Sequence, residues 1–333
     1  MSLLQAHFPE RLKRGNHARL ITVGLVNNMS GRGQKATVRQ FRQLLTRSGG
    51  NPPVRLRIFV LPEMLRLFDG QSSIAEHFEP IEELWTSDLD GLIVSGTEPR
   101  AATLEEEPCW PTLTRLVEWA ECRTVSTIWS CLAAHLAVRY LDGIARRTLP
   151  RKLFGLFECT RHDPHPLLDG LPSQWLVPHS RYNEIPEERL IAHDYAILTR
   201  SRYAGADTFI KQNGTLHVFL QGHPEYDLGA LSREYRRDIR RYLSGEDDRF
   251  PEIPQSYFPA AIADELRAFR QRALTQRRAE LLAEFPTAAT GETAQTPWAG
   301  VAARFYENWL SWIAARKYSR LTGAVPVCPA LHP

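Results

Sequence analysis

The stretch STIWSCLAAHLAVRYLDGI, residues 126–144, decides the fold because it joins a strand pattern to a helix pattern across a single cysteine. Residues 124–130 form a short run rich in β-branched and aromatic side chains, which is typical of a buried strand. Residues 132–141 carry apolar side chains at helical spacing. A residue that ends a strand and precedes a helix lies at the carboxyl edge of a parallel sheet, where open α/β sheets bind ligands. We therefore expect Cys131 at a functional edge of the molecule.

Strand and helix patterns also alternate on the N-terminal side of this stretch. The expected strands cover 19–28, 54–61 and 89–96, and the expected helices cover 36–49 and 110–123. This alternation predicts an α/β fold in which helices cover both faces of a parallel sheet.

The pattern changes after residue 150. Short strand-like runs are broken by proline, a hairpin turns at Asn213-Gly214, and an arginine-rich amphipathic helix covers 229–245. The tail returns to helical patterns. We expect an N-terminal arm over 1–18, a catalytic α/β domain over 19–247, and a helical C-terminal extension over 248–333 that packs on the same domain.

Composition narrows the class of protein. The 333 residues are 43% hydrophobic and 24% charged, as in globular proteins, and the net charge of +3 is too mild to imply a nucleic-acid partner. No apolar run approaches the ~18 residues of a membrane span, and the N-terminus does not read as a signal peptide. The five cysteines form no CxxC pair, which favours a reduced, cytoplasmic compartment.

The position of Cys131 suits a nucleophile. A helix N-terminus offers partial positive charge and free N–H groups, which activate a thiol and can bind an oxyanion. A buried core cysteine is the alternative, and position alone does not decide between them. A thiol nucleophile also needs a base, and FLQGHPEYD (219–227) places His223 after a strand-like run with Glu225 two residues on, where it can orient the imidazole. A solvated loop histidine is the alternative for His223.

Five segments occur in the order seen in one enzyme family: SCLAAHLAV (130–138), KLFGLFE (152–158), VPHSRYNEIP (177–186), GHPEYD (222–227) and FYENWLSW (305–312). From about residue 20 to 320 the chain resembles the homoserine O-acyltransferases of methionine biosynthesis, which are homoserine O-succinyltransferases and O-acetyltransferases. The resemblance implies a flavodoxin-like, class I glutamine amidotransferase-like fold. It also implies ping-pong acyl transfer from an acyl-CoA co-substrate, with no permanent cofactor, and a homodimer.

The resemblance assigns roles residue by residue. Cys131 would carry the acyl group as a thioester, His223 would act as general base, and Glu225 would orient His223. The oxyanion would be met by the backbone N–H of Leu132 and a second N–H from Gly96 or Thr97. The family's substrate-binding positions fall on Lys152, Ser180 and Arg237, and a guanidinium at the last of these suits an α-carboxylate.

The chain departs from the family pattern at several positions. Leu132 and His135 replace an aromatic residue and a glutamine, while Ser30 and Val38 replace a proline and an acid. Arg32 and Lys35 are expected to meet CoA phosphates or an acyl carboxylate. In the family that the chain resembles, the residue at the position of Arg100 is associated with the choice of acyl donor. A small residue there accompanies succinyl transfer, and a glutamate accompanies acetyl transfer. A cation there either pairs with the succinyl carboxylate, which favours succinyl-CoA over acetyl-CoA, or faces solvent.

Other functions stay open at this point. The acceptor is homoserine or, in a divergent member, serine. An amide hydrolase related to class I glutamine amidotransferases would use the same Cys131, His223 and Glu225, and a non-catalytic relative is a third reading. The pair His162 and His165 does not complete a metal site, so no metal is expected. Small-molecule substrates are the expected partners, without nucleic acid or membrane.

Overall fold

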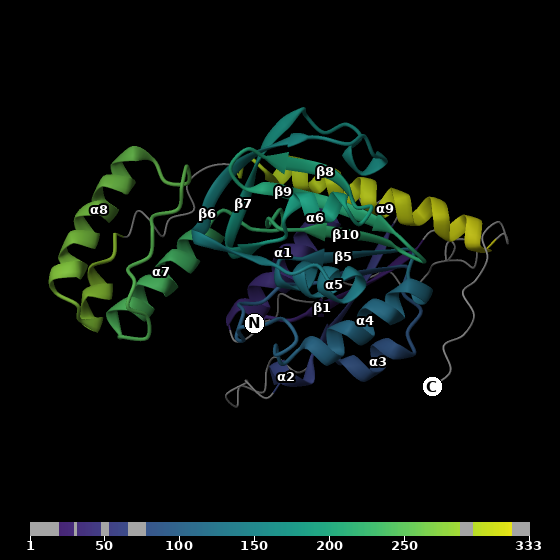
Figure 1. The fold of residues 1–333 in the computed structure, drawn as a ribbon, viewed down its shortest axis with the longest axis horizontal. Helices are drawn as coiled ribbons and strands as arrows, with labels where there is room; N and C mark the ends of the chain where they lie inside the picture. The colour runs from purple at the N-terminus through teal and green to yellow at the C-terminus, as the bar shows by residue number, and fades with distance from the viewer. Residues whose placement is uncertain (1–19, 30–31, 48–52, 66–77, 287–295, 322–333) are drawn as a thin grey trace, which may run out of the picture.

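The structure is a computed structural model that describes residues 20–29, 32–47, 53–65, 78–286 and 296–321 (Figure 1). The expected arm over 1–18 and the family departure at Ser30 lie outside the described residues. None of the described helices is both long and apolar enough to cross a membrane.

The described strands form one ten-stranded sheet in the order β3-β2-β1-β4-β5-β10-β9-β8-β6-β7. The pairs from β3 to β10 are parallel, and the pairs from β10 to β7 are antiparallel. The strand bounds are β1 Ile21–Asn27, β2 Val54–Val60, β3 Glu79–Pro80, β4 Gly91–Val94, β5 Ser126–Ser130, β6 Arg147–Arg161, β7 Gln174–Glu184, β8 Ala196–Ser201, β9 Gly205–Gln212 and β10 Leu216–Leu220.

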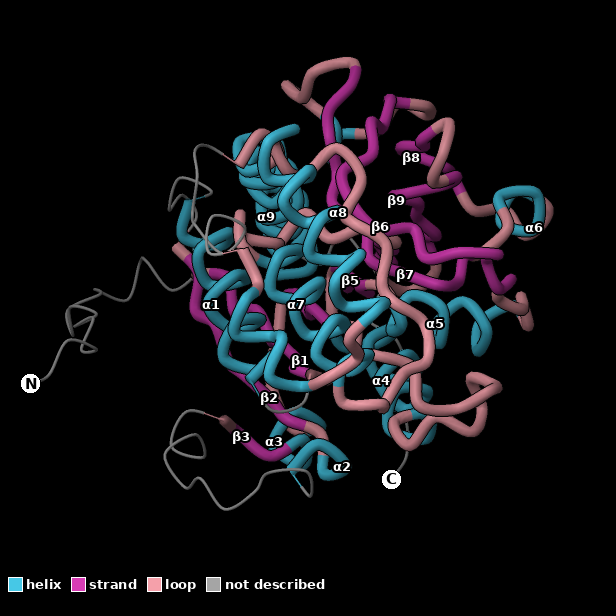
Figure 2. The backbone as a smooth tube through the Cα atoms, turned by 90° about the vertical axis from the view of Figure 1, so that its left-hand side faces the viewer, coloured by secondary structure: helices cyan, strands magenta, loops and turns pink. Residues whose placement is uncertain are grey.

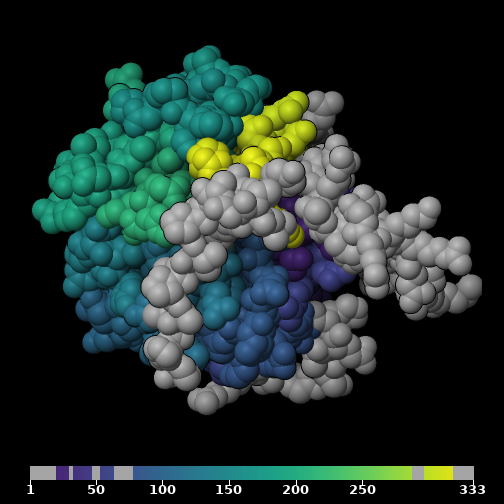
Figure 3. All heavy atoms as spheres, turned by 90° about the vertical axis from the view of Figure 1, so that its right-hand side faces the viewer, coloured from purple at the N-terminus to yellow at the C-terminus, as the bar shows by residue number. Residues whose placement is uncertain are grey.

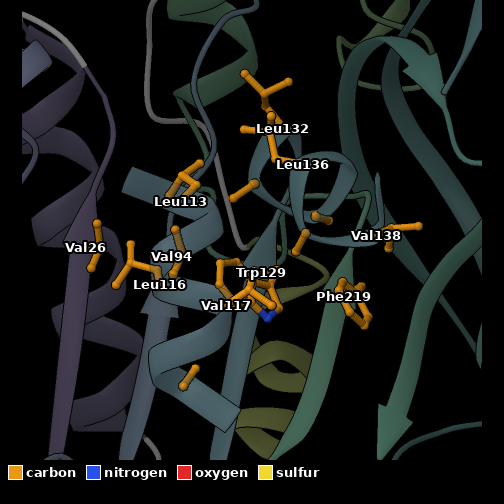
Figure 4. Packing of buried hydrophobic residues seen from close by; sticks show 14 of the residues in the cluster. Val26, Val94, Leu113, Leu116, Val117, Trp129, Leu132, Leu136, Val138 and Phe219 are labelled. Carbon is orange, nitrogen blue, oxygen red and sulfur yellow. The ribbon is translucent and has the colours of Figure 1, made fainter. Parts of the chain in front are cut away.

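Helices cover both faces of the parallel part of the sheet, so the predicted α/β fold is confirmed. The helix bounds are α1 Arg32–Arg47, α2 Pro62–Leu65, α3 Ile81–Trp85, α4 Trp110–Arg123, α5 Leu132–Asp142, α6 Glu187–Ile191, α7 Ala230–Leu243, α8 Ala260–Thr275 and α9 Ala299–Leu321, with 3₁₀ helices η3 Pro166–Leu168 and η4 Ala279–Glu284. On one face α3, α4 and α5 close a buried cluster, in which Leu116 and Leu136 lie over Trp129 and Phe219 (Figure 4). Helices α1 and α9 close a second cluster on the opposite face.

The C-terminal helices divide between two places. Helix α9 packs on the parallel strands, where the buried Trp309 donates its indole N–H to Ser126 Oγ at 2.8 Å. Figure 3 shows part of α9, in yellow, at the surface beside the teal antiparallel strands. Helices α7 and α8 lie next to each other at one end of the molecule, on the left in Figure 1 and facing the viewer in Figure 2, and they build a third cluster with η4 and β6. The domain boundaries at 18/19 and 247/248 stay a prediction.

The antiparallel strands are longer than the proline-broken sequence pattern predicts. Strand β7 tolerates Pro178 because it is the edge strand, where a missing N–H leaves no ladder partner unsatisfied. Strand β6 continues through Gly155, whose φ of +138° lets the backbone of Gln255 approach from the side. Gln255 donates to the Phe154 carbonyl at 2.8 Å and accepts from the Leu156 N–H at 2.9 Å. This strand is therefore bordered by a segment a hundred residues later in the chain.

Candidate active site

Cys131 lies at a strained turn between β5 and α5. Its backbone has φ 51° and ψ −116°, a region that residues with a Cβ seldom adopt. The Cys131 N–H donates to the Leu220 carbonyl of β10 at 2.7 Å, which fixes the turn at the carboxyl edge of the sheet. The same kind of strained strand-to-helix turn exposes the nucleophile of α/β-hydrolases. Cys131 is half-buried, unlike the fully buried Cys109 and Cys159, so the alternative of a closed core cysteine does not hold for it.

His223 is held on two sides beside Cys131. Its backbone N–H donates to the Pro178 carbonyl of β7 at 2.8 Å, and its Nδ1 lies 2.8 Å from Glu225 Oε1. The Cys131 side chain lies close enough to the imidazole to raise the pKa of His223. Since Glu225 occupies Nδ1, the nitrogen left for the thiol is Nε2.

Charge around His223 favours the imidazolium. Burial opposes protonation, but the negative charges of Glu225 and Cys131 and the hydrogen bonds to both raise the pKa of His223 well above its ordinary 6.5. The alternative of a solvated loop histidine is wrong, because His223 is only 7% exposed. The arrangement suits a base that takes a proton from a thiol and gives it to a leaving group.

The backbone of Gly96 runs directly past the cysteine. A Cβ added at Gly96 would lie 2.8 Å from Cys131 Cβ and 3.2 Å from the Leu132 nitrogen. Leu132 is the first residue of α5, where N–H groups have no acceptor within the helix. Thr97 follows at the end of β4 and is half-buried. The two backbone segments expected to bind the oxyanion therefore lie against Cys131.

The substrate-binding residues expected from the resemblance meet at one acidic pair on α7. Lys152 Nζ lies 2.8 Å from Asp238 Oδ2, and Arg237 Nη2 lies 2.7 Å from Asp238 Oδ1. Ser180 donates its hydroxyl proton to Glu234 Oε2, which also lies 4.0 Å from Lys152 Nζ. Sequence reasoning missed both Glu234 and Asp238. Their positions on an amphipathic helix gave no signal of which face of that helix turns toward the site.

The four charges at this site stabilise one another. Burial opposes ionisation of Asp238, but the charges of Lys152 and Arg237 and their hydrogen bonds lower its pKa below 3.8. Burial likewise opposes the charge on Arg237, and the carboxylates of Glu234, Asp238 and Glu98 raise its pKa. A bound zwitterion can place its carboxylate against one of the two cations and its ammonium against one of the two anions. No buried charge is then left unpaired.

Tyr226 connects the two groups of residues, and sequence reasoning missed it as well. Its ring stacks on the imidazole of His223, with ring centroids 4.2 Å apart and an interplanar angle of 16°. Its hydroxyl donates to Glu234 Oε1. The thiol, the imidazole and the acidic pair thus form one continuous site.

The chain departs from the family pattern at Arg100, Lys35 and His135, and none of these three residues takes part in the contacts above. The Arg100 side chain is exposed, and its backbone N–H donates to the buried Glu107 carboxylate at 3.0 Å. Lys35 is also exposed, and the side chain of Arg32 lies outside the description. His135 is buried one turn after Cys131, and burial, with the nearby charges of Arg181 and Arg146, lowers its pKa to about 3. It is therefore neutral at physiological pH.

A second group of side chains could hold a metal by composition but does not fit one by chemistry. Cys159, His179 and Asp207 are buried with their ligand atoms within 4.8 Å of one another. Arg181 Nε donates to His179 Nδ1 at 3.4 Å, so the proton sits on Nε2, which faces Asp207 Oδ1 at 3.3 Å. A ligating Nε2 would need a free lone pair, and burial raises the pKa of the Cys159 thiol.

The two histidines of the sequence RHDPHP do not gather ligands around them in the described structure. His165 caps η3, accepting from the Leu167 N–H at 3.2 Å, and its ring lies 4.9 Å from that of Trp312. His165 therefore has a structural role between η3 and α9.

Comparison with known proteins extends across nearly the whole chain. A family model described as homoserine O-succinyltransferase matches residues 7–320. A homoserine O-succinyltransferase from Rhodopseudomonas palustris is 45% identical over 302 residues, which cover 91% of each chain. One from Methylorubrum extorquens is 43% identical over 90% of this chain and 88% of its own. Among solved structures, a glutamine amidotransferase from Thermotoga maritima is similar at 13% identity and a TM-score of 0.49, covering 88% of this chain and 98% of that one. The family match and the two homoserine O-succinyltransferases show that this chain belongs to the homoserine O-succinyltransferase family.

Proposed function

We propose that this protein transfers an acyl group from CoA to the hydroxyl of homoserine, with succinyl-CoA preferred to acetyl-CoA, through a thioester on Cys131. The observation that carries the proposal is the strained Cys131 beside an imidazole whose Nδ1 is held by Glu225 at 2.8 Å. The names of the relatives support the donor and the acceptor.

In the first half-reaction the Cys131 thiolate attacks the thioester carbonyl carbon of acyl-CoA. The carbonyl oxygen takes the negative charge and is bound by the N–H of Leu132 and that of Gly96 or Thr97. Collapse of the intermediate breaks the bond between carbon and the CoA sulfur. The departing CoA thiolate takes the proton of the His223 imidazolium, which leaves an acyl-enzyme and a neutral imidazole.

In the second half-reaction the neutral His223 removes the proton of the acceptor hydroxyl. The acceptor oxygen attacks the acyl carbon, and the Cys131 sulfur leaves as thiolate beside the new imidazolium. Glu225 keeps the proton of His223 on the correct nitrogen in both steps. The resting ion pair is restored, and no cofactor is consumed.

The acidic pair on α7 and its cations suit the amino-acid end of the acceptor. Arg237 would bind the α-carboxylate in a bidentate manner, and Glu234 would accept hydrogen bonds from the α-ammonium. Lys152 and Ser180 already contact this acidic pair and would keep its orientation when the acceptor enters. The acceptor then takes the place of ion pairs that the free protein makes internally.

Donor choice, assembly and context are further parts of the proposal. Arg100 would pair with the free carboxylate of a succinyl group, since its exposed side chain lies on the loop that follows Gly96. We also propose a homodimer that acts in methionine biosynthesis in the cytoplasm. Light scattering after size exclusion would test the dimer.

A substrate panel tests the proposed function. Succinyl-CoA and acetyl-CoA are each combined with homoserine and with serine, and free CoA is measured. We expect the fastest release with succinyl-CoA and homoserine, and Arg100→Glu should lower the ratio of succinyl to acetyl transfer. Hydrolysis of glutamine without acyl transfer would favour the amide-hydrolase alternative instead.

A further inference from the structure

Tyr226 lies between the imidazole of His223 and the carboxylate of Glu234 and contacts both. One face of its ring stacks on His223 at 4.2 Å between centroids, while its hydroxyl reaches Glu234 on α7. His223 and Glu234 come from different elements. Tyr226 is therefore a direct physical link between the group that moves protons and the group that would bind the acceptor.

Hydrogen bonds to both the N–H and the carbonyl of Tyr226 fix the backbone that carries the ring. The Tyr226 N–H donates to the His223 carbonyl at 3.1 Å, which closes a tight turn. The Tyr226 carbonyl accepts from the indole N–H of the buried Trp298 at 2.9 Å. Because its backbone is fixed by these two hydrogen bonds, the Tyr226 side chain holds a defined position against His223 and Glu234.

The Tyr226 hydroxyl acts as a hydrogen-bond donor to Glu234. Burial and the negative charges of Glu234 and Glu225 raise the pKa of Tyr226 well above 10, so the hydroxyl stays protonated. Glu234 accepts from Tyr226 on Oε1 and from Ser180 on Oε2. The two hydroxyls therefore set the plane of the Glu234 carboxylate and leave its remaining lone pairs in a fixed direction.

We propose that Tyr226 is a positioning residue that aligns acceptor binding with the catalytic base: its hydroxyl orients Glu234 toward the acceptor ammonium while its ring holds His223 in plane. This inference rests on the proposed function. It predicts that the hydroxyl matters only in the second half-reaction, and only for an acceptor that carries an ammonium group.

The test separates the half-reactions of the full-length protein. Without acceptor, succinyl-CoA gives a burst of CoA that reports acylation of Cys131. Discharge of the acyl-enzyme is then followed with homoserine and with hydroxylamine, a small nucleophile that has no α-ammonium or carboxylate. For Tyr226→Phe we expect an unchanged burst rate, an unchanged rate with hydroxylamine, and a KM for homoserine raised about tenfold, as for loss of one hydrogen bond to a charged group.

Other variants separate the stacking of the Tyr226 ring on His223 from the hydrogen bond of its hydroxyl to Glu234. Tyr226→Leu removes the stacking and should slow both half-reactions, including discharge by hydroxylamine. Glu234→Ala should raise the homoserine KM, and adding Tyr226→Phe to it should have no further effect, because the Tyr226 hydroxyl then has no carboxylate to orient. Tyr257→Phe is the matched control, since its hydroxyl bonds to the backbone at Leu228 and Ser232, and it should behave as the wild type.

Three outcomes would overturn the inference without touching the proposed function. The first is an unchanged homoserine KM in Tyr226→Phe, and the second is an equal loss with homoserine and hydroxylamine. The third is additive effects of Tyr226→Phe and Glu234→Ala. Absence of the CoA burst from the wild-type protein would instead overturn the proposed function and, with it, this inference.

Discussion

At the scale of the residue, the backbone of Cys131 decides where the sulfur points. Its φ of 51° with ψ of −116° is a conformation that glycine adopts readily and that costs other residues about 1–3 kcal/mol. Cys131→Gly should therefore unfold at higher urea concentration than Cys131→Ala, although glycine is normally the less stable choice. Equal midpoints, or a less stable glycine variant, would show that the turn is not strained.

The second prediction at this scale concerns the pKa of His223. Because Glu225 raises the pKa of His223, Glu225→Gln should lower the NMR titration midpoint of this imidazole. A raised folded-state pKa stabilises the protein fully below pH 6.5, and this contribution is lost as the pH rises through the folded-state value. The variant should therefore lose stability mainly at low and neutral pH. An identical midpoint in both proteins would contradict this cause of the shift.

The candidate nucleophile and its partners could be predicted from sequence because each lies within a few residues of a strand end. Cys131 follows β5 directly, and His223 follows β10 after two residues. Tyr226, Glu234 and Asp238 could not be predicted in the same way. The roles of Glu234 and Asp238 depend on which face of α7 turns toward β6 and β7, and the role of Tyr226 depends on its contact with Glu234. The local pattern does not contain that information.

At the scale of the element, Glu121 fastens the β9–β10 hairpin to α4. Its carboxylate lies 2.6 Å from His217 Nε2 and accepts from the Gly214 N–H at 2.6 Å. His217 is fully buried, and its Nδ1 accepts from the Trp129 indole at 2.9 Å, so Nε2 must be the donor to Glu121. The hairpin turn is therefore anchored at the end of the sheet opposite to Cys131.

We expect Glu121→Ala to lower the free energy of unfolding by about 2 kcal/mol, since it leaves buried donors without an acceptor. Urea unfolding measures this loss, and the CoA burst should keep its wild-type rate. Glu118→Ala is the control, because Glu118 lies on the same helix, is exposed and accepts only from the exposed Tyr140 hydroxyl among the contacts of the described residues, so that the change should cost less than about 1 kcal/mol. Equal effects of the two variants would contradict the anchoring role.

Strand lengths illustrate what local patterns miss. The parallel strands β5 and β10 were recognisable because each is a short run that contains β-branched and aromatic side chains, and each is buried throughout. The length of β6 depends instead on its antiparallel pairing with β7, and Gln255 adds a further pairing beside Gly155. A contact between segments a hundred residues apart has no signature in either segment.

At the scale of the whole molecule, α9 completes the core beneath the parallel strands. Trp309 is fully buried, and a Cβ added at Gly91 of β4 would lie 3.1 Å from its ring. Trp309→Ala should cost about 3–5 kcal/mol, because it opens a cavity between α9 and the sheet. Fluorescence and circular dichroism should then report one shared unfolding transition at lower urea. Separate transitions would show that α9 folds apart from the sheet.

The central claim is that the sulfur of residue 131 carries the acyl group between donor and acceptor. Intact-protein mass spectrometry after mixing with succinyl-CoA, without acceptor, tests it most directly. The account predicts a mass gain of one succinyl group that disappears when homoserine is added and never forms in Cys131→Ser. A gain that persists in Cys131→Ser, or that maps to another cysteine, would contradict it.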